Sequence, residues 1–173
     1  MNHLYNIFIK LIDKIILPLL GLFNSKIRRF QTNRLSLIKK INDEVLEKNN
    51  NIWFHVASLG EYEIAVPLIR AIKKKYKKKI ILTFFSESGF KLKKRITEID
   101  NTYYLPLDTK SNAKRFLDAI NPQLVIFIRS EIWPNFLSEI KKREIKCFLV
   151  ESRFKKNSRY LLSLIHISEP TRP

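Results

Sequence analysis

Between residues 51 and 150, short apolar runs alternate with longer segments whose apolar residues recur at helical spacing. The short runs are typical of buried strands, and the longer segments are typical of helices with one apolar face. The predicted strands are Ile52–Val56, Ile80–Phe85, Tyr103–Leu105, Leu124–Ile128 and Cys147–Val150, and the predicted helices are Glu61–Tyr76, Phe90–Ile96, Ser111–Ile120 and Pro134–Arg143. This alternation favours an α/β fold in which helices flank a Rossmann-like parallel sheet.

The N-terminal segment has a different pattern. Leu4 to Phe23 is mostly apolar, but Lys10, Asp13 and Lys14 interrupt it, whereas a spanning helix needs about 20 consecutive apolar residues. The polar positions fall on one helical face, which leaves a broad apolar face opposite. Because basic residues follow from Lys26 onward, the pattern favours an amphipathic helix on an anionic membrane surface. The alternative is an ordinary helix packed on the domain.

Composition adds a strong charge to this picture. The 173-residue chain has a net charge of +17, and its 45% hydrophobic content excludes a disordered polycation. A single cysteine, Cys147, excludes an intramolecular disulfide framework. The charge indicates an anionic partner, which is a nucleic acid, a phosphate-bearing ligand or a membrane, unless it is only a solvated Lys-rich surface.

Ligands of such sheets bind beyond the carboxyl ends of the strands, so the loops there hold the candidate residues. Ser58 and Glu61 follow the first strand in a Ser-x-x-Glu pattern, which is typical of a capping box at a helix start. On spacing alone the cap is favoured, and the alternative is that Glu61 acts as a general base on a substrate hydroxyl, while Gly60 would let a substrate approach the backbone.

The other strand ends supply weaker candidates. Ser88 and Gly89, in the loop that begins at Ser86, are suited to present backbone N–H groups and a hydroxyl to a phosphate. Glu131 follows the fourth strand and is a second carboxylate for the same cleft, or a charge that stabilises the next helix. Trp133 is a candidate for either packing or function, and we interpret His55, which lies within a strand, as a hydrogen-bonded core residue.

The loops together resemble a known family, the bacterial 3-deoxy-D-manno-octulosonic acid (Kdo) transferases. Residues 53–61, Trp-Phe-His-Val-Ala-Ser-Leu-Gly-Glu, resemble the family's H-x-x-S-x-G-E motif. Residues 104–108, Tyr-Leu-Pro-Leu-Asp, resemble Y-L-P-x-D, and residues 131–135, Glu-Ile-Trp-Pro-Asn, resemble E-L-W-P-N. Residues 121–124 and 152–154 resemble the family's helix-to-strand joint and its A-R-L segment. The order and spacing of these motifs make the resemblance specific.

The resemblance implies the N-terminal, acceptor-binding domain of a glycosyltransferase-B fold. Such an enzyme transfers Kdo from CMP-Kdo to the lipid A precursor at the cytoplasmic face of the inner membrane, without a metal or other cofactor. It implies Glu61 as the catalytic base and Ser58, Gly60, Ser88, Gly89 and Glu131 as substrate-binding residues. The alternatives are a basic nucleic-acid-binding module, for which no recognition motif is present, and the acceptor domain of another membrane-associated glycosyltransferase.

The resemblance also divides the chain. We expect a membrane-associating helix over residues 1–25, a basic helical connector over 26–50 and the acceptor-binding domain over 51–161. Residues 162–173 resemble a translated sequencing adapter and are expected to be a non-native tail. Because the family's enzymes have a second, donor-binding domain, we expect this chain to be inactive alone.

Overall fold

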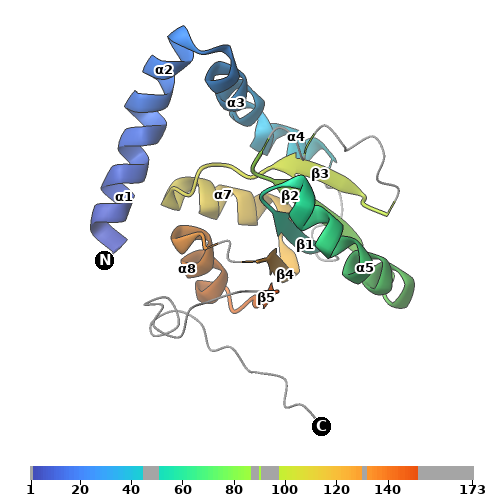
Figure 1. The fold of residues 1–173 in the computed structure, drawn as a ribbon. Coiled ribbons are helices and arrows are strands. Elements are labelled where there is room, and N and C mark those ends of the chain that lie inside the picture. Colours follow the sequence, from blue (N-terminus) through green and yellow to red (C-terminus); the bar gives the residue numbers. More distant parts are fainter. Residues whose placement is uncertain (1, 45–50, 87–89, 91–97, 130–131, 152–173) are drawn as a thin grey trace.

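A five-stranded parallel sheet forms the centre of the part of the chain that the computed structural model describes, residues 2–44, 51–86, 90, 98–129 and 132–151. The strands are β1 (Asn51–Val56), β2 (Lys79–Phe84), β3 (Asn101–Tyr104), β4 (Pro122–Ile128) and β5 (Lys146–Val150). Their order across the sheet is β3-β2-β1-β4-β5, and every neighbouring pair is parallel (Figure 1). The predicted Rossmann-like α/β class is confirmed.

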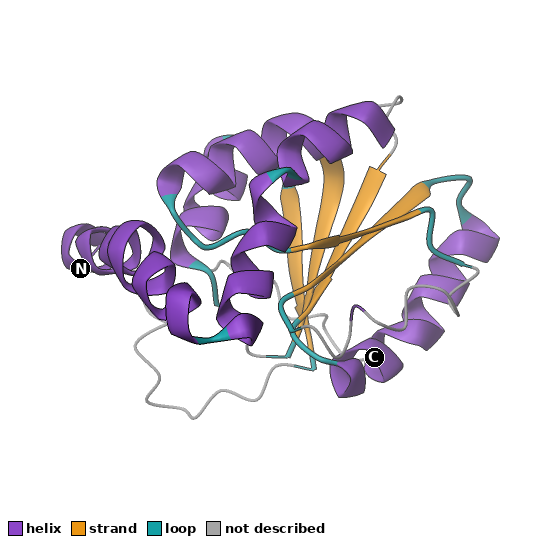
Figure 2. Ribbon diagram, turned by 90° about the horizontal axis from the view of Figure 1, so that it is seen from above, coloured by secondary structure: helices purple, strands orange, loops and turns teal. Residues whose placement is uncertain are grey.

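Helices cover both faces of the sheet, as its apolar strands require (Figure 2). One face packs against α5 (Leu59–Lys75), and the other packs against α4 (Leu37–Glu44), α7 (Lys110–Ile120) and α8 (Pro134–Lys142). The ends of these elements lie within two residues of the predicted ends wherever a prediction was made. Of the predicted helix Phe90–Ile96, only Phe90 is among the described residues, and it is helical.

Trp53 organises the core on the α7–α8 side. Its ring lies 5.1 Å from that of Phe116, 5.5 Å from that of Phe127 and 5.6 Å from that of Phe136, measured between centroids. Its indole N–H donates to Thr83 Oγ1 at 2.8 Å, so the polar end of this fully buried side chain is satisfied. The same core contains Leu37 and Ile41 of α4, which ties that helix to the sheet.

The N-terminal segment is a continuous run of helix made of α1 (Asn2–Leu11), a π-helical turn (Ile12–Ile16) and α2 (Leu17–Phe23). The π turn precedes Pro18, whose missing N–H would interrupt a regular helix. Asn24 then reverses the chain, because its Oδ1 accepts from the backbone N–H of Lys26 at 2.9 Å and begins α3 (Ser25–Leu35). The domain boundaries at residues 25, 50 and 161 stay predictions.

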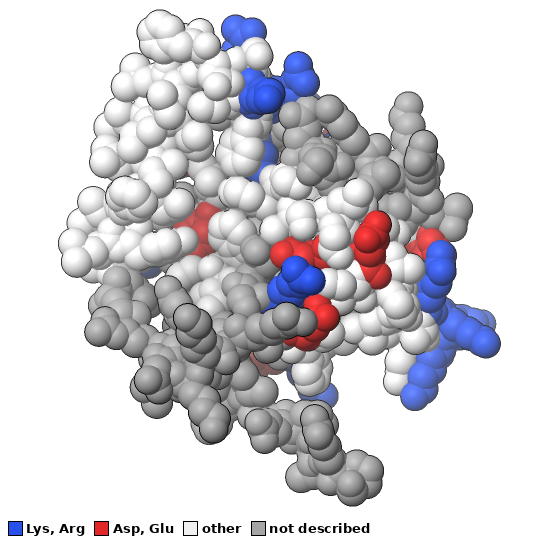
Figure 3. Space-filling model, in the orientation of Figure 1, with Lys and Arg blue, Asp and Glu red and all other residues white. Residues whose placement is uncertain are grey.

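The apolar side of the N-terminal helices faces away from the sheet. Asn6 is buried and the Tyr5 hydroxyl bonds to the domain. Large apolar side chains on the other side are exposed to solvent: Leu4, Ile7, Phe8, Leu11, Ile15, Leu19, Leu20, Leu22 and Phe23. On the face shown in Figure 3, the surface over α1 and α2 is almost uncharged, while Lys and Arg side chains gather over α3 and at the far end of α5. In the described part of the chain, no helix combines the length and the apolarity that a membrane span requires.

Candidate functional site

The chain direction across the sheet reverses between β1 and β4. From β1 the chain proceeds to β2 and β3 on one side, and then returns to β4 and β5 on the other. In sheets of this topology, ligands bind at the carboxyl edge beside this reversal. Two predicted loops, residues 57–61 and 129–135, follow the two strands that flank it. The topology therefore places Glu61 at the expected binding edge.

Glu61 is anchored through one carboxylate oxygen. Its Oε2 accepts from the backbone N–H of Ala57, and among the described residues Oε1 has no hydrogen-bond partner. The predicted capping box is wrong in both halves, because the Ser58 side chain makes no cap bond and Glu61 does not accept from the Ser58 amide. The Glu61 carboxylate instead satisfies an amide one residue further upstream. The side chain is thus anchored to the backbone through one oxygen, while the other makes no hydrogen bond in the described part of the chain.

Gly60 borders open space. A Cβ built at this position would meet no heavy atom within 4 Å, and the residue does not have a positive φ. Neither packing nor backbone conformation therefore requires glycine here, in the first turn of α5. The absence of a side chain leaves room beside Glu61.

The remaining predicted substrate residues, Ser88, Gly89 and Glu131, lie outside the described residues, so their roles stay predictions. The loop that leads to Ser88 is tied to the Glu61 loop, since the Ser86 amide donates to the Ala57 carbonyl at 3.0 Å. The loops after β1 and β2 therefore start from adjoining positions at this edge.

Strained backbone occurs at the same edge, after β4 and β5. Arg129 has a φ of 62° and Glu151 a φ of 55°, both in the left-handed region that side chains other than glycine rarely adopt. Their side chains form an ion pair at 3.3 Å, and the Arg129 amide donates to the Val150 carbonyl at 2.7 Å. Strain of this kind gathers at functional sites, and these two residues lie at the same edge of the sheet as Glu61.

His55 and Trp133 have packing roles. His55 is buried and its Nδ1 lies 2.8 Å from Thr83 Oγ1, as expected for a hydrogen-bonded core histidine. Trp133 packs on Phe85 with 4.9 Å between ring centroids, and on His55 with 5.8 Å. Phe85 in turn contacts Phe30 of α3, so a row of contacting rings connects His55, Trp133, Phe85 and α3.

Asp108 is a functional candidate that sequence reasoning did not assign a role. The carboxylate is fully buried and accepts from the backbone N–H groups of Asn135 and Phe136, each at 3.0 Å. It also accepts from the Tyr5 hydroxyl of α1 at 2.8 Å. Because Trp133, at the N-cap of α8, offers no capping side chain, Asp108 caps α8 from a distant part of the chain.

This capping also explains why two of the resembling motifs occur together. The Y-L-P-x-D segment supplies Asp108, and the E-x-W-P-N segment supplies the amides that it binds. Burial raises the pKa of Asp108 to about 6, although its three hydrogen bonds favour the ionised form. The sequence shows a carboxylate after β3 and a helix start without a capping residue. Because the two are 27 residues apart, no local pattern indicates that one caps the other.

The described residues contain no group of three or more His, Cys, Asp or Glu side chains that could hold a metal ion. The candidate site is therefore made of a carboxylate, backbone amides and open space at the reversal point of a parallel sheet.

Comparison with known proteins gives the family of the chain. The family model for 3-deoxy-D-manno-octulosonic-acid transferase matches residues 29–166, which is more than half of the chain. The chain belongs to this family. The match includes residues 162–166 of the segment predicted to be non-native, and the origin of that tail stays a prediction.

Several curated relatives carry the same name. A 3-deoxy-D-manno-octulosonic acid transferase of Rickettsia felis is 36% identical over 109 residues, which are 62% of this chain and 23% of the relative. One of Haemophilus influenzae is 27% identical over 156 residues, 89% of this chain and 36% of the relative. A bifunctional glycosyltransferase/methyltransferase of Fusobacterium nucleatum is 28% identical over 86% of this chain and 23% of the relative. The chain thus spans about a quarter to a third of these relatives' length.

Among solved structures, a UDP-N-acetylglucosamine 2-epimerase matches with a TM-score of 0.47 and 15% identity, over 68% of this chain and 36% of that one. This likeness is too partial to bear on the site or its chemistry.

Replacement of Asp108 by Asn tests the buried cap through the pH dependence of stability. A carboxyl whose pKa is raised on folding stabilises the folded state most below its unfolded pKa, and this contribution is lost as pH rises toward about 6. The difference in unfolding free energy between wild type and Asp108→Asn should therefore shrink from pH 4 to pH 7, by about 3 kcal/mol at most. Urea unfolding across this range measures it.

Asp118→Asn is the matched control. Asp118 is half exposed, and hydrogen bonds from Lys114 and Arg143 lower its pKa, so its smaller contribution should grow as pH rises. A gap for Asp108→Asn that is constant with pH would show that this carboxyl does not titrate differently on folding.

Proposed function

We propose that this chain binds the acceptor in the transfer of Kdo from CMP-Kdo to the lipid A precursor, a step of lipopolysaccharide biosynthesis. Membership of the Kdo transferase family supports the reaction class. The observation that carries the site assignment is Glu61, with one oxygen anchored and one available at the reversal point of the sheet. The chain is then part of a glycosyltransferase.

In the proposed step, Glu61 Oε1 takes the proton from an acceptor hydroxyl as the hydroxyl oxygen attacks the anomeric carbon of Kdo. The bond from that carbon to the CMP phosphate breaks, and CMP leaves with the electron pair. The Ala57 N–H holds Oε2, so the base stays oriented while its charge changes. Gly60 admits the acceptor, and Ser58, Ser88, Gly89 and Glu131 are the proposed substrate contacts.

The donor CMP-Kdo is proposed to bind mainly outside this chain. The Haemophilus relative is matched over only 36% of its length, which leaves ample sequence for a second, donor-binding domain in such a protein. On this proposal, residues 1–173 alone do not transfer sugar.

The site of action is proposed to be the cytoplasmic leaflet of the bacterial inner membrane. The support is the outward apolar side of α1 and α2, together with exposed cations such as Lys26, Arg28 and Arg29 that begin directly after it. Burial of one Leu or Phe side chain contributes about 1.5–3 kcal/mol, and cations near an anionic surface add to this. A lipid acceptor in the same leaflet would then reach the carboxyl edge.

Glu61→Gln tests the catalytic base in the complete gene product. The amide keeps the size of the side chain but cannot take a proton, so the transfer rate should fall by about 100-fold or more. Transfer from CMP-Kdo to the lipid A precursor is followed by chromatography of the labelled lipid. Glu63→Gln, exposed in the same turn of α5, is the control and should keep normal turnover. Near-normal turnover of Glu61→Gln would remove the assignment.

Gly60→Ala separates the needs of the fold from those of the site. The added methyl group meets open space and lies in a helix, so thermal stability should be unchanged or slightly raised. Transfer should fall because the methyl group occupies the room beside Glu61. A loss of stability together with activity would mean that the glycine serves the fold instead.

Vesicle flotation tests the membrane surface. Leu19→Gln combined with Phe23→Gln alters two exposed positions that share one face, and should weaken binding to phosphatidylglycerol vesicles by about tenfold or more. Phe148→Gln, which changes an exposed apolar residue on β5, is the control and should bind as wild type does. Equal binding by both variants would contradict the proposed orientation.

A further inference from the structure

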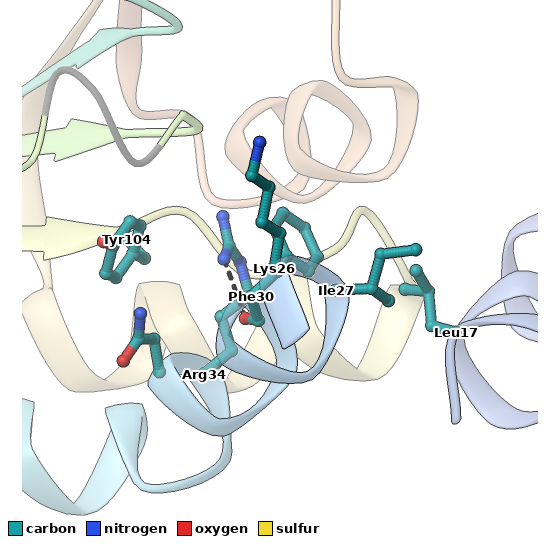
Figure 4. A pocket seen from close by; sticks show the side chains of 7 residues that line it. Leu17, Lys26, Ile27, Phe30, Arg34 and Tyr104 are labelled. Carbon is teal, nitrogen blue, oxygen red and sulfur yellow. Dashed lines mark hydrogen bonds between the residues drawn. The ribbon is translucent and has the colours of Figure 1, made fainter. Parts of the chain in front are cut away.

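A cavity of about 330 Å³ lies between α2, α3 and the carboxyl end of β3, apart from Glu61. Leu17, Ile27 and Phe30 are its apolar lining residues, and Lys26, Asn33, Arg34 and Tyr104 complete the lining. In the close-up, Leu17 and Ile27 meet at one end, and the charged ends of Lys26 and Arg34 point the same way (Figure 4). In the sheet, β3 is two positions away from β1, the strand that Glu61 follows.

Arg34 brings a largely buried cation to this cavity. Its guanidinium donates to the carbonyls of Leu105 and Phe85, both at 2.8 Å, and to that of Phe30 at 3.0 Å. The charge lies 3.6 Å from the centre of the Phe30 ring, and no carboxylate pairs with it among the described residues. Burial lowers the pKa of Arg34 to about 10, so the group stays charged at neutral pH.

Arg34 makes three hydrogen bonds through its guanidinium, all to backbone carbonyls. A guanidinium has five N–H groups, and the three carbonyls engage only part of them. Lys26 adds a second cation at the rim, and in the described part of the chain it has no acidic partner either. A cavity lined by two cations that have no carboxylate partner among the described residues favours an anionic group at this end.

The size and position of the cavity narrow the ligand further. Its volume lies at the lower end of the roughly 300–1,000 Å³ range of small-molecule pockets, which suits one chain and not a whole multi-chain lipid. Leu17 belongs to α2, whose neighbouring residues Leu19 and Leu20 form part of the outward apolar side. A hydrocarbon chain from a membrane in contact with that side would enter next to Leu17.

We infer that this cavity binds one acyl chain of an anionic membrane phospholipid, with the chain among Leu17, Ile27 and Phe30 and the phosphate toward Lys26 and Arg34. The site rests on the proposed contact of α1 and α2 with a membrane, and is separate from the site at Glu61. An occupied cavity joins α2 and α3 to the strand ends that Arg34 already holds, so a bilayer lipid would fix these helices against the carboxyl edge.

The test uses calorimetric titration of the complete gene product with monomeric probes below their micelle concentrations. Lauroyl lysophosphatidylglycerol supplies one chain and an anionic group, lauroyl lysophosphatidylcholine supplies the same chain with no net charge, and glycerol phosphate supplies the head alone. We expect one site for the first probe, binding of the second that is weaker by about two- to fivefold, and no measurable binding of the third. Equal affinity of glycerol phosphate and the anionic lysolipid would overturn the inference.

Variants locate the binding. Ile27→Trp fills the apolar end of the cavity and should lower the affinity for the anionic lysolipid by about tenfold or more. Leu35→Trp changes an exposed position of the same helix and should leave this affinity unchanged. Lys26→Gln, at an exposed position that tolerates substitution, should remove the preference for the anionic lysolipid, and Arg28→Gln should preserve it. Unchanged binding in both Ile27→Trp and Lys26→Gln would sink the site.

Two further measurements distinguish this site from the proposed reaction. Glu61→Gln should bind the anionic lysolipid normally, so a loss of transfer and a loss of this binding are separate results. Competition with a monophosphorylated lipid A tests the source of the chain. Weak displacement supports a bilayer phospholipid, and displacement at equimolar concentration would assign the cavity to the acceptor and overturn the inference.

Discussion

The buried carboxylate of Asp108 holds together three segments that are far apart in the chain. It accepts from the start of α8 and from Tyr5 of α1, while its own residue follows β3. Loss of these bonds would leave buried amides unpaired, at a cost of about 1–3 kcal/mol each. The Asn135 side chain adds a return bond to the Asp108 carbonyl, so the loop and the helix start constrain each other. The start of α8, beside the candidate site, is therefore held by a residue of the segment that follows β3.

The same carboxylate determines which way the N-terminal helix faces. Tyr5 and Asn6 turn toward the domain, and the helical period then directs Leu4, Phe8 and Leu11 outward. In most soluble domains the apolar side of such a helix packs on the core, whereas here it is exposed. The Tyr5–Asp108 hydrogen bond thus helps to orient α1 on the domain, together with the half-buried side chain of Ile9. The apolar side remains for another apolar phase, which is the physical basis for the proposed membrane contact.

The pattern of apolar residues was sufficient to predict the strands and helices of the domain. Strands such as β1 and β4 were predictable because both faces are buried and their residues are almost all apolar. The position of Glu61 at the end of β1 was predictable for the same reason, while its role stays a prediction. The roles of Asp108 and Arg34 were not, since their partners are distant in sequence: Asp108 binds α8, and Arg34 binds the carbonyls of Phe85 and Leu105. The capping box failed for a related reason, because the Ser-x-x-Glu spacing does not say which amide Glu61 will reach.

The large positive charge is a poor guide to the site, as its distribution shows. The Lys-rich end of α5 lies at the amino edge of the sheet, where Lys73 pairs with Asp100 and Lys78 donates to Gln123 at 2.8 Å. Cations at a helix C-terminus stabilise the helix dipole, so this cluster has a structural explanation far from Glu61. At the carboxyl edge, Arg129 is paired with Glu151, whereas Arg34 and Lys26 have no acidic partner among the described residues. The proposed lipid site therefore depends on these two side chains and not on the total charge of +17.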